Sequence, residues 1–110
     1  MINSRKKGNS FELQVINELK SIYGENVHST RSMNRVLDSQ KVDICGDVPY
    51  NIQCKATETV PQVHKIFAEM NQDKPCLIWW KRNHKPQIVI MEAETFLQIL
   101  LTLQENSLSL

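Results

Sequence analysis

The stretch VDICGDVPYNIQCKATE, residues 42–58, predicts two short strands joined by a turn. Apolar residues dominate VDICG and YNIQCKAT, and the GDVP segment at 46–49 between them is typical of a tight connection. We therefore expect an antiparallel hairpin. Because side chains alternate across a strand, Gln53 and Lys55 share its polar face, where Asp43 comes within side-chain reach of Gln53. The hairpin would bring an acid, an amide oxygen and an amine to one edge of a sheet.

The segments around this hairpin predict a single α/β domain over residues 1–110. In chain order we expect a helix over 10–24, a strand over 26–31, a loop over 32–41, the hairpin, a helix from Pro61, strands over 75–80 and 87–91, and a helix over 92–104. The apolar stripe of the first helix comprises Phe11, Val15, Ile16, Leu19, Ile22 and Tyr23. PCLIWW and QIVIM are continuous apolar runs, which is typical of strands covered on both faces. The order α-β-β-β-α-β-β-α indicates a mixed central sheet flanked by helices.

The composition of the chain says more about its cellular compartment than about its binding partner. With 13 Lys and Arg against 12 Asp and Glu, the net charge of +1 neither indicates nor excludes a nucleic-acid partner. The cysteines, Cys45, Cys54 and Cys76, lack the spacing of a zinc site and are interpreted as buried, reduced thiols. FLQILLTL, the longest apolar run, is shorter than the roughly 20 residues that cross a bilayer. We expect no membrane partner and a cytoplasmic protein, or one in the host cytoplasm if a phage encodes it.

The polar face of the hairpin, VD(43)I…IQ(53)CK(55), resembles the active-site motif of the PD-(D/E)XK nuclease superfamily. Upstream, RKKGNSFELQVINELK is similar to the first helix of archaeal-type and phage Holliday-junction resolvases, with Lys7, Gly8 and Glu12 at the motif positions. The expected order of elements matches the restriction-endonuclease-like core of that superfamily. The resemblance runs from about Arg5 to Leu101 and so covers most of the chain.

The resemblance implies a metal-dependent DNA endonuclease that resolves four-way junctions in DNA recombination and works as a homodimer. Its cofactor would be Mg²⁺, or Mn²⁺ in its place, held by oxygen ligands that such hard cations prefer. The implied metal ligands are Glu12, Asp43, the amide oxygen of Gln53 and the carbonyl of Cys54. Lys55 would orient the attacking water and stabilise the transition state, so the implied catalytic set is Glu12, Asp43, Gln53 and Lys55.

Gln53 departs from the family pattern, which usually has Glu or Asp at this position. The missing negative charge is expected to weaken metal affinity. Asp47 in the turn is a substitute acid, although turn chemistry explains it equally well. Taken singly, Glu12 would complete a capping box with Asn9, and Asp43 would be a solvated surface carboxylate. The alternatives are therefore a catalytically silent DNA-binding protein of this fold, or a nuclease of this fold that acts on other DNA structures.

Clusters of basic residues would follow the phosphates of branched or duplex DNA. The DNA-binding residues we expect are Arg5, Lys6 and Lys7 before the first helix and Arg31 and Arg35 beside the predicted loop. A further cluster over residues 81–85 is explained equally well as a solvated turn. Resolvases carry a functional Ser near the first strand, and the sequence leaves Ser29, Thr30 and Ser32 open for that position.

Apolar residues in the second half exceed what one side of a small sheet can cover. They are Trp79 and Trp80, together with Phe96, Leu97, Ile99, Leu100, Leu101 and Leu103 of the closing helix. We expect part of this surface to be buried between two subunits, in agreement with the implied homodimer.

Overall fold

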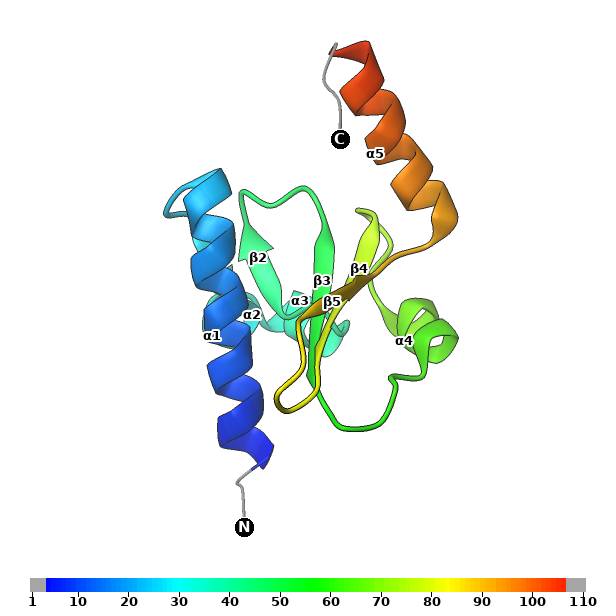
Figure 1. Ribbon diagram of the computed structural model, residues 1–110. Coiled ribbons are helices and arrows are strands. Elements are labelled where there is room, and N and C mark those ends of the chain that lie inside the picture. Colours follow the sequence, from blue (N-terminus) through cyan, green and yellow to red (C-terminus); the bar gives the residue numbers. More distant parts are fainter. Residues whose placement is uncertain (1–3, 107–110) are drawn as a thin grey trace.

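The computed structural model describes residues 4–106, and their organising element is a mixed sheet of five strands with helices on both faces (Figure 1). The strands are β1 (Val27–Ser29), β2 (Ile44–Gly46), β3 (Asn51–Ala56), β4 (Cys76–Lys81) and β5 (Ile88–Ile90). The helices are α1 (Ser4–Tyr23), α2 (Thr30–Met33), α3 (Arg35–Ser39), α4 (Val63–Glu69) and α5 (Ala93–Glu105). The chain therefore has the α/β architecture with a mixed sheet that its sequence predicts.

The strands lie in the order β1-β2-β3-β4-β5, so each strand pairs with its neighbour in the chain. β2 and β3 pair antiparallel, which confirms the predicted hairpin. β3 and β4 are parallel, and α4 connects them as the crossover. The remaining pairs, β1 with β2 and β4 with β5, are antiparallel.

The helix α1 covers one face of the sheet through its predicted apolar stripe. Its buried residues are Phe11, Val15, Ile16 and Leu19, which pack against Val27, Ile44, Val48, Ile52 and Leu77. Ile22 is an exception, because it lies in the last turn and is 73% exposed. The helix also begins at Ser4, earlier than expected. Asn9 therefore lies inside the helix, and the predicted capping box with Glu12 is wrong.

The opposite face carries a second core beneath α4. It consists of Phe67, Met70, Cys76, Ile78 and Trp80, with Val63, Ile66 and Ile90 packed against it. The alternation of side chains along β4 explains why there are two cores, since Leu77 and Trp79 face α1 while Ile78 and Trp80 face α4. β3 is therefore enclosed between two helical layers.

The expected loop over 32–41 is wrong, because residues 30–39 form the two short helices α2 and α3. Each helix has a polar residue at its N-terminus that caps it. The Ser29 hydroxyl accepts from the Arg31 N–H at 3.3 Å, and the Asn34 side chain accepts from the Leu37 N–H at 3.1 Å. Such local side-chain bonds stabilise short helices in a segment with few apolar residues.

The expectation that both late strands are covered on both faces holds for β4 but is wrong for β5. β5 is the edge strand, with Ile88 48% exposed and Val89 38% exposed. The helix α5 does not cover β5 because it projects away from the sheet (Figure 1). No residue of α5 is buried, and its Phe96, Leu97 and Leu101 are exposed.

Neither tryptophan contributes the exposed apolar surface expected of it. Trp80 is buried and donates its indole N–H to the carbonyl of Thr57 at 2.9 Å. Trp79 packs beside the α1 core and donates to Gln87 at 2.7 Å. The apolar surplus of the second half therefore lies on α5 and β5 within the described residues 4–106.

The cysteines are unpaired, although only Cys76 is fully buried and Cys45 and Cys54 are half-buried. Within residues 4–106, no helix combines the length and apolar character that crossing a membrane requires.

Candidate active site

The predicted catalytic residues of the hairpin lie where β2 and β3 separate. Ile44 pairs with Ile52, and the Asp43 N–H donates to the carbonyl of the same Ile52, so the regular ladder between β2 and β3 ends at Asp43. The side chain of Gln53 lies on the α4 face of the sheet because its neighbours in β3, Ile52 and Cys54, pack on the α1 face. Lys55 follows Gln53 by two positions and shares its face. The amide and the amine therefore share one face of β3, and the acid lies beside Cys54 between them in the chain, where its Oδ2 accepts from the Cys54 N–H.

Asp43 is fixed by hydrogen bonds from three directions. Its N–H donates to the carbonyl of Ile52 at 2.8 Å, and its own carbonyl accepts from the Thr30 N–H at 3.0 Å. Its side-chain Oδ2 accepts from the N–H of Cys54 at 2.7 Å. The carboxylate thus occupies the place at which β2 would otherwise have continued its pairing with β3. It is a partly buried, preorganised acid and not the solvated one that its position alone would suggest.

Burial raises the pKa of Asp43 from 3.8 to about 6. The hydrogen bond from Cys54 works in the opposite direction, as does the nearby charge of Lys55. The negative charges of Glu12 and Asp38 contribute to this rise in the pKa. Asp43 is therefore ionised at neutral pH at a cost in free energy, and a cation bound beside it would remove that cost.

Gln53 presents an acceptor that the protein leaves without a partner. The side chain is 9% exposed, and its Oε1 is buried without a hydrogen bond. An unpaired buried acceptor costs about 1–3 kcal/mol, so such atoms usually have a functional or a solvent-related explanation. A hard cation or an ordered water next to Oε1 would satisfy it.

The carbonyl of Cys54 faces the same edge as Asp43. In an extended strand, the N–H and C=O of one residue point to the same side of the strand, and the Cys54 N–H points at Asp43. The alternate residues Gln53 and Lys55 therefore direct their backbone groups toward β4. Asp43, Gln53 and Cys54 together offer a carboxylate, an amide oxygen and a backbone carbonyl, which are donors suited to Mg²⁺ or Mn²⁺.

Glu12 reaches this region from α1 and is held there by two donors. It is 7% exposed, and its Oε1 accepts from Ser29 Oγ at 2.7 Å and from Arg31 Nη2 at 3.1 Å. Its negative charge contributes to the raised pKa of both Asp43 and Cys54, which places it near both. Ser29 is therefore the residue near the first strand that contacts the site, a choice that the sequence left open.

Arg31 has a structural role beside any role in DNA binding. In addition to Glu12, its Nη1 donates to Asn9 at 2.6 Å, and its side chain is 42% exposed. The guanidinium thus bridges α1 and α2 and compensates the buried charge of Glu12. Arg35 on α3 is exposed, as are Arg5 and Lys6 at the start of α1.

Lys55 is half-buried and lines a groove of about 420 Å³ between the end of β3 and α4. Its positive charge lowers the pKa of Asp43. The prediction that Asp47 could replace the missing acid is wrong, because Asp47 follows β2 and lies at the opposite end of that strand from Asp43. There its Oδ1 accepts from Asn26 at 3.0 Å.

No group of three or more His, Cys, Asp and Glu side chains that could hold a metal occurs among residues 4–106. The oxygen set identified above differs from such a group, because two of its donors are an amide and a backbone carbonyl. Fewer negative charges predict weaker binding than in a site with a second acid at position 53. The set nevertheless fits a hard divalent cation in the type of each donor atom.

Comparison of the chain with protein-family models, with curated proteins and with solved structures finds no match.

Proposed function

We propose that this protein is a metal-dependent DNA endonuclease with the site of the PD-(D/E)XK superfamily. The observation that carries the proposal is the buried Oε1 of Gln53, which lacks a partner, next in the chain to Cys54, whose N–H binds the Asp43 carboxylate with its pKa raised to about 6. Both features disfavour the metal-free protein, and one cation would relieve both. Lys55 on the same strand supplies the amine that phosphodiester hydrolysis needs beside the metal.

The arrangement of elements supports the proposal. The segment α1-β1-β2-β3-α4-β4 follows the order of the restriction-endonuclease-like core that the sequence resembles, with α2 and α3 inserted between β1 and β2. The parallel β3-α4-β4 unit leaves the carboxyl end of β3 accessible from the groove along α4. A DNA strand entering this groove would reach Lys55 and Asp43.

Each residue of the site has a distinct part in the proposed reaction. Asp43, Gln53 Oε1 and the Cys54 carbonyl would hold Mg²⁺, which supplies charge compensation at the scissile phosphate and acidifies a nearby water. The Cys54 N–H keeps the Asp43 carboxylate oriented toward the cation. Lys55 orients the attacking water and donates to a phosphate oxygen as negative charge develops. Glu12, held by Ser29 and Arg31, adds negative charge at the border of the metal site.

A four-way junction is the substrate that the resemblance to resolvases favours. Such enzymes cut two symmetric strands, so the proposal includes a two-fold dimer with two sites. The exposed apolar residues of α5 and β5, including Phe96, Leu97 and Ile88, support this part, since a dimer would bury them. Arg5, Lys6 and Arg35 are exposed and would contact the phosphates of the junction arms.

The experiment is a cleavage and binding assay on a four-way junction, a linear duplex and a single strand of equal length. We expect cleavage that requires Mg²⁺ or Mn²⁺, binding that is tightest for the junction and weakens with salt, and a dimer by sedimentation at micromolar concentration. A monomer, or equal affinity for junction and duplex, would remove the resolvase assignment and leave a nuclease acting on other DNA structures.

The second candidate is a catalytically silent DNA-binding protein of the same fold. Two observations favour it: position 53 is an amide, and the Oε1 of Glu12 is already occupied by Arg31 and Ser29. This protein would bind DNA with the same salt dependence but without a requirement for Mg²⁺.

Substituting Gln53→Glu separates the two candidates. A second carboxylate beside Asp43 raises the attraction for a divalent cation, so we expect equal or faster cleavage and a lower Mg²⁺ requirement. Without metal, the same variant should melt at a lower temperature than wild type, because two partly buried like charges repel. Gln98→Glu on α5 is the matched control and should change neither property. If wild type and Gln53→Glu both fail to cut any DNA with Mg²⁺ or Mn²⁺, the silent binder is the better account.

A further inference from the structure

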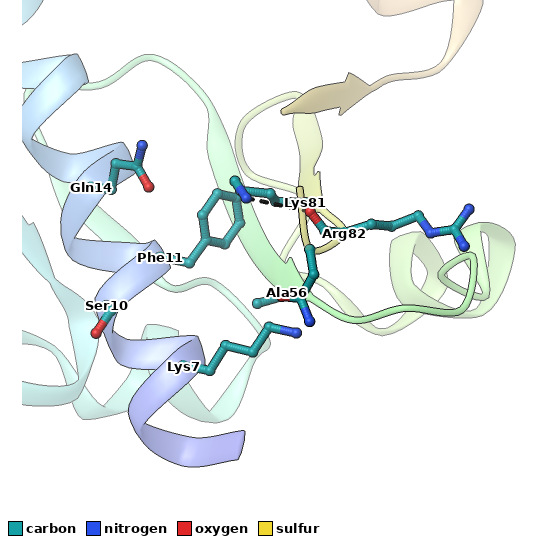
Figure 2. Close-up of a pocket in the computed structure, with 8 residues that line it drawn as sticks. Lys7, Ser10, Phe11, Gln14, Ala56, Lys81 and Arg82 are labelled. Carbon is teal, nitrogen blue, oxygen red and sulfur yellow. Dashed lines mark hydrogen bonds between the residues drawn. The ribbon is translucent and has the colours of Figure 1, made fainter. Parts of the chain in front are cut away.

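A second cavity lies on the α1 face of the sheet, at the carboxyl ends of β3 and β4 (Figure 2). Its volume is about 210 Å³, and it is lined by Lys7, Ser10, Phe11, Gln14, Ala56, Lys81, Arg82 and Asn83. Ala56 pairs with Lys81 in the parallel register, and both side chains face α1. Lys55, one residue before Ala56, points to the other face. The cavity is therefore separate from the candidate active site and adjoins it through β3.

Two lysines approach the cavity from different elements. Figure 2 shows Lys7 of α1 and Lys81 of β4 on either side of the Phe11 ring, while the Arg82 guanidinium points away. Lys81 is half-buried and Lys7 has a side chain that is 24% exposed. The Nζ of Lys81 donates to the carbonyl of Arg82 at 3.3 Å, and an anion between the two lysines would give each ammonium group a further, charged partner.

Glu58 partly neutralises the positive charge of Lys7 in the folded chain. Its Oε2 lies 3.6 Å from the Nζ of Lys7 and accepts from the N–H of Asn83 at 2.8 Å. The hydrogen bond from Asn83 and the charge of Lys7 hold the pKa of Glu58 below its ordinary value. The carboxylate is 54% exposed, so solvent competes for the ion pair and another anion can replace it.

Size and position indicate what that anion is. Pockets for whole small molecules have volumes of about 300–1,000 Å³, and a cavity of about 210 Å³ suits a phosphate group better than a complete nucleotide. Consecutive Cα atoms are about 3.8 Å apart, so Lys55 and Ala56 lie within the span of a few nucleotides of one DNA strand. A strand that leaves the active site around the carboxyl end of β3 would therefore reach Lys7 and Lys81 on the other face.

We propose that the cavity between Lys7 and Lys81 binds a backbone phosphate of the DNA strand held in the active site, and that this phosphate replaces Glu58 beside Lys7. The proposal rests on the proposed DNA substrate and adds a contact on the opposite face of β3. It makes Glu58 an internal competitor, which lowers the affinity for DNA until a phosphate reaches the cavity.

The test uses the full chain and a fluorescent four-way junction in buffer without divalent cations, with affinity measured by anisotropy over a KCl series. Lys81→Ala should weaken binding about three- to tenfold and reduce the slope of log K against log [salt] by about 0.9, the value for one phosphate. Lys81→Gln keeps the length of the side chain and should give the same change of slope if the alanine variant folds poorly. Lys20→Ala is the control, since Lys20 lies about 20 Å from Lys7 along α1, beyond the screening length.

The proposed competition between Glu58 and a DNA phosphate is tested with two matched variants, each of which removes one negative charge. Glu58→Gln can still accept from Asn83 and should tighten binding about two- to fivefold by releasing Lys7. Glu25→Gln removes the same charge from the Lys20–Glu25 pair, whose Nζ and Oε2 are 3.7 Å apart, and should not tighten binding. When Lys7→Ala is present, Glu58→Gln should give no further gain.

The outcomes distinguish this inference from the nuclease proposal. Equal slopes for Lys81→Ala and Lys20→Ala, or equal affinities for Glu58→Gln and Glu25→Gln, would overturn the phosphate site while leaving cleavage untouched. A chain that shows the predicted slopes but cuts no DNA keeps the phosphate site and loses the nuclease function. A chain that binds no DNA loses both.

Discussion

Asparagine in place of Asp43 is expected to abolish DNA cleavage, with a rate at least about a thousandfold below wild type. The substitution removes the carboxylate of the proposed metal site, and about 4 kcal/mol of lost transition-state stabilisation corresponds to that factor. The amide oxygen of the new side chain can still accept from the Cys54 N–H, so the local structure should be retained. Single-turnover cleavage of a four-way junction measures the loss.

The same substitution is expected to stabilise the metal-free protein above pH 6. Asp43 has a pKa raised from 3.8 to about 6, so the native state holds its proton more tightly than the unfolded chain does. The stability from this group is therefore fully present below pH 3.8 and is lost as the pH rises through 6, by about 3 kcal/mol in total. Asparagine has no charge to bury, so the variant should exceed wild type near neutral pH and match it in acid. Urea unfolding in EDTA at several pH values measures the difference.

Asp47→Asn is the matched control for cleavage, because it removes the same charge from the other end of β2 and should leave cleavage near wild type. Wild-type cleavage by Asp43→Asn would exclude Asp43 as a metal ligand. A metal-free protein that is less stable after Asp43→Asn would instead contradict the proposed cost of the buried charge.

Alanine in place of Gly46 should destabilise the fold by about 3 kcal/mol or more, a fall in melting temperature of about 12–24 °C. Gly46 has a φ of 115°, and a Cβ there would lie 2.0 Å from the carbonyl oxygen of Asn26. That oxygen also accepts from the Asp47 N–H at 2.8 Å, and Val27 pairs with Gly46, so the backbone has little freedom to move. Thermal unfolding by circular dichroism measures the effect.

Gly8→Ala is the control for this prediction. Gly8 lies inside α1, and a Cβ there would meet no atom within 4 Å. Alanine is the better helix former, so this variant should be about 0.5–1 kcal/mol more stable than wild type. Melting temperatures within a few degrees of wild type for Gly46→Ala would show that the approach of β1 to β2 is not as close as described.

The elements that the sequence predicts correctly are those with a strong local pattern. The helix stripe of Phe11, Val15 and Leu19 and the alternation along β3 follow directly from side-chain periodicity. The GDVP turn, with Gly46 at positive φ, precedes β3 and is consistent with the register in which Ile44 pairs with Ile52. These features depend on neighbours in the chain, so a single sequence contains them.

The parts that sequence reasoning missed depend on contacts between distant residues. The helix α2 is tied to the chain before β2 by Thr30 Oγ1, which donates to the carbonyl of Val42 at 2.6 Å. Glu12 is oriented by Ser29, which lies 17 residues later. The cavity at Lys7 and Lys81 forms only when α1 packs on β4, so the basic clusters of the sequence that contain these residues do not show that they lie side by side. The exposure of β5 likewise depends on the direction in which α5 leaves the sheet.

Direct measurement of Mn²⁺ binding by electron paramagnetic resonance tests the oxygen set of Asp43, Gln53 and Cys54 most directly. The signal of free Mn²⁺ should fall when the full-length protein is added at pH 7.5, and binding should weaken as protons compete for Asp43 near pH 6. Asp47→Asn should bind as wild type does, and Asp43→Asn should not bind. No bound Mn²⁺ at millimolar concentrations, or equal binding by wild type and Asp43→Asn, would contradict a metal site at this edge of the sheet.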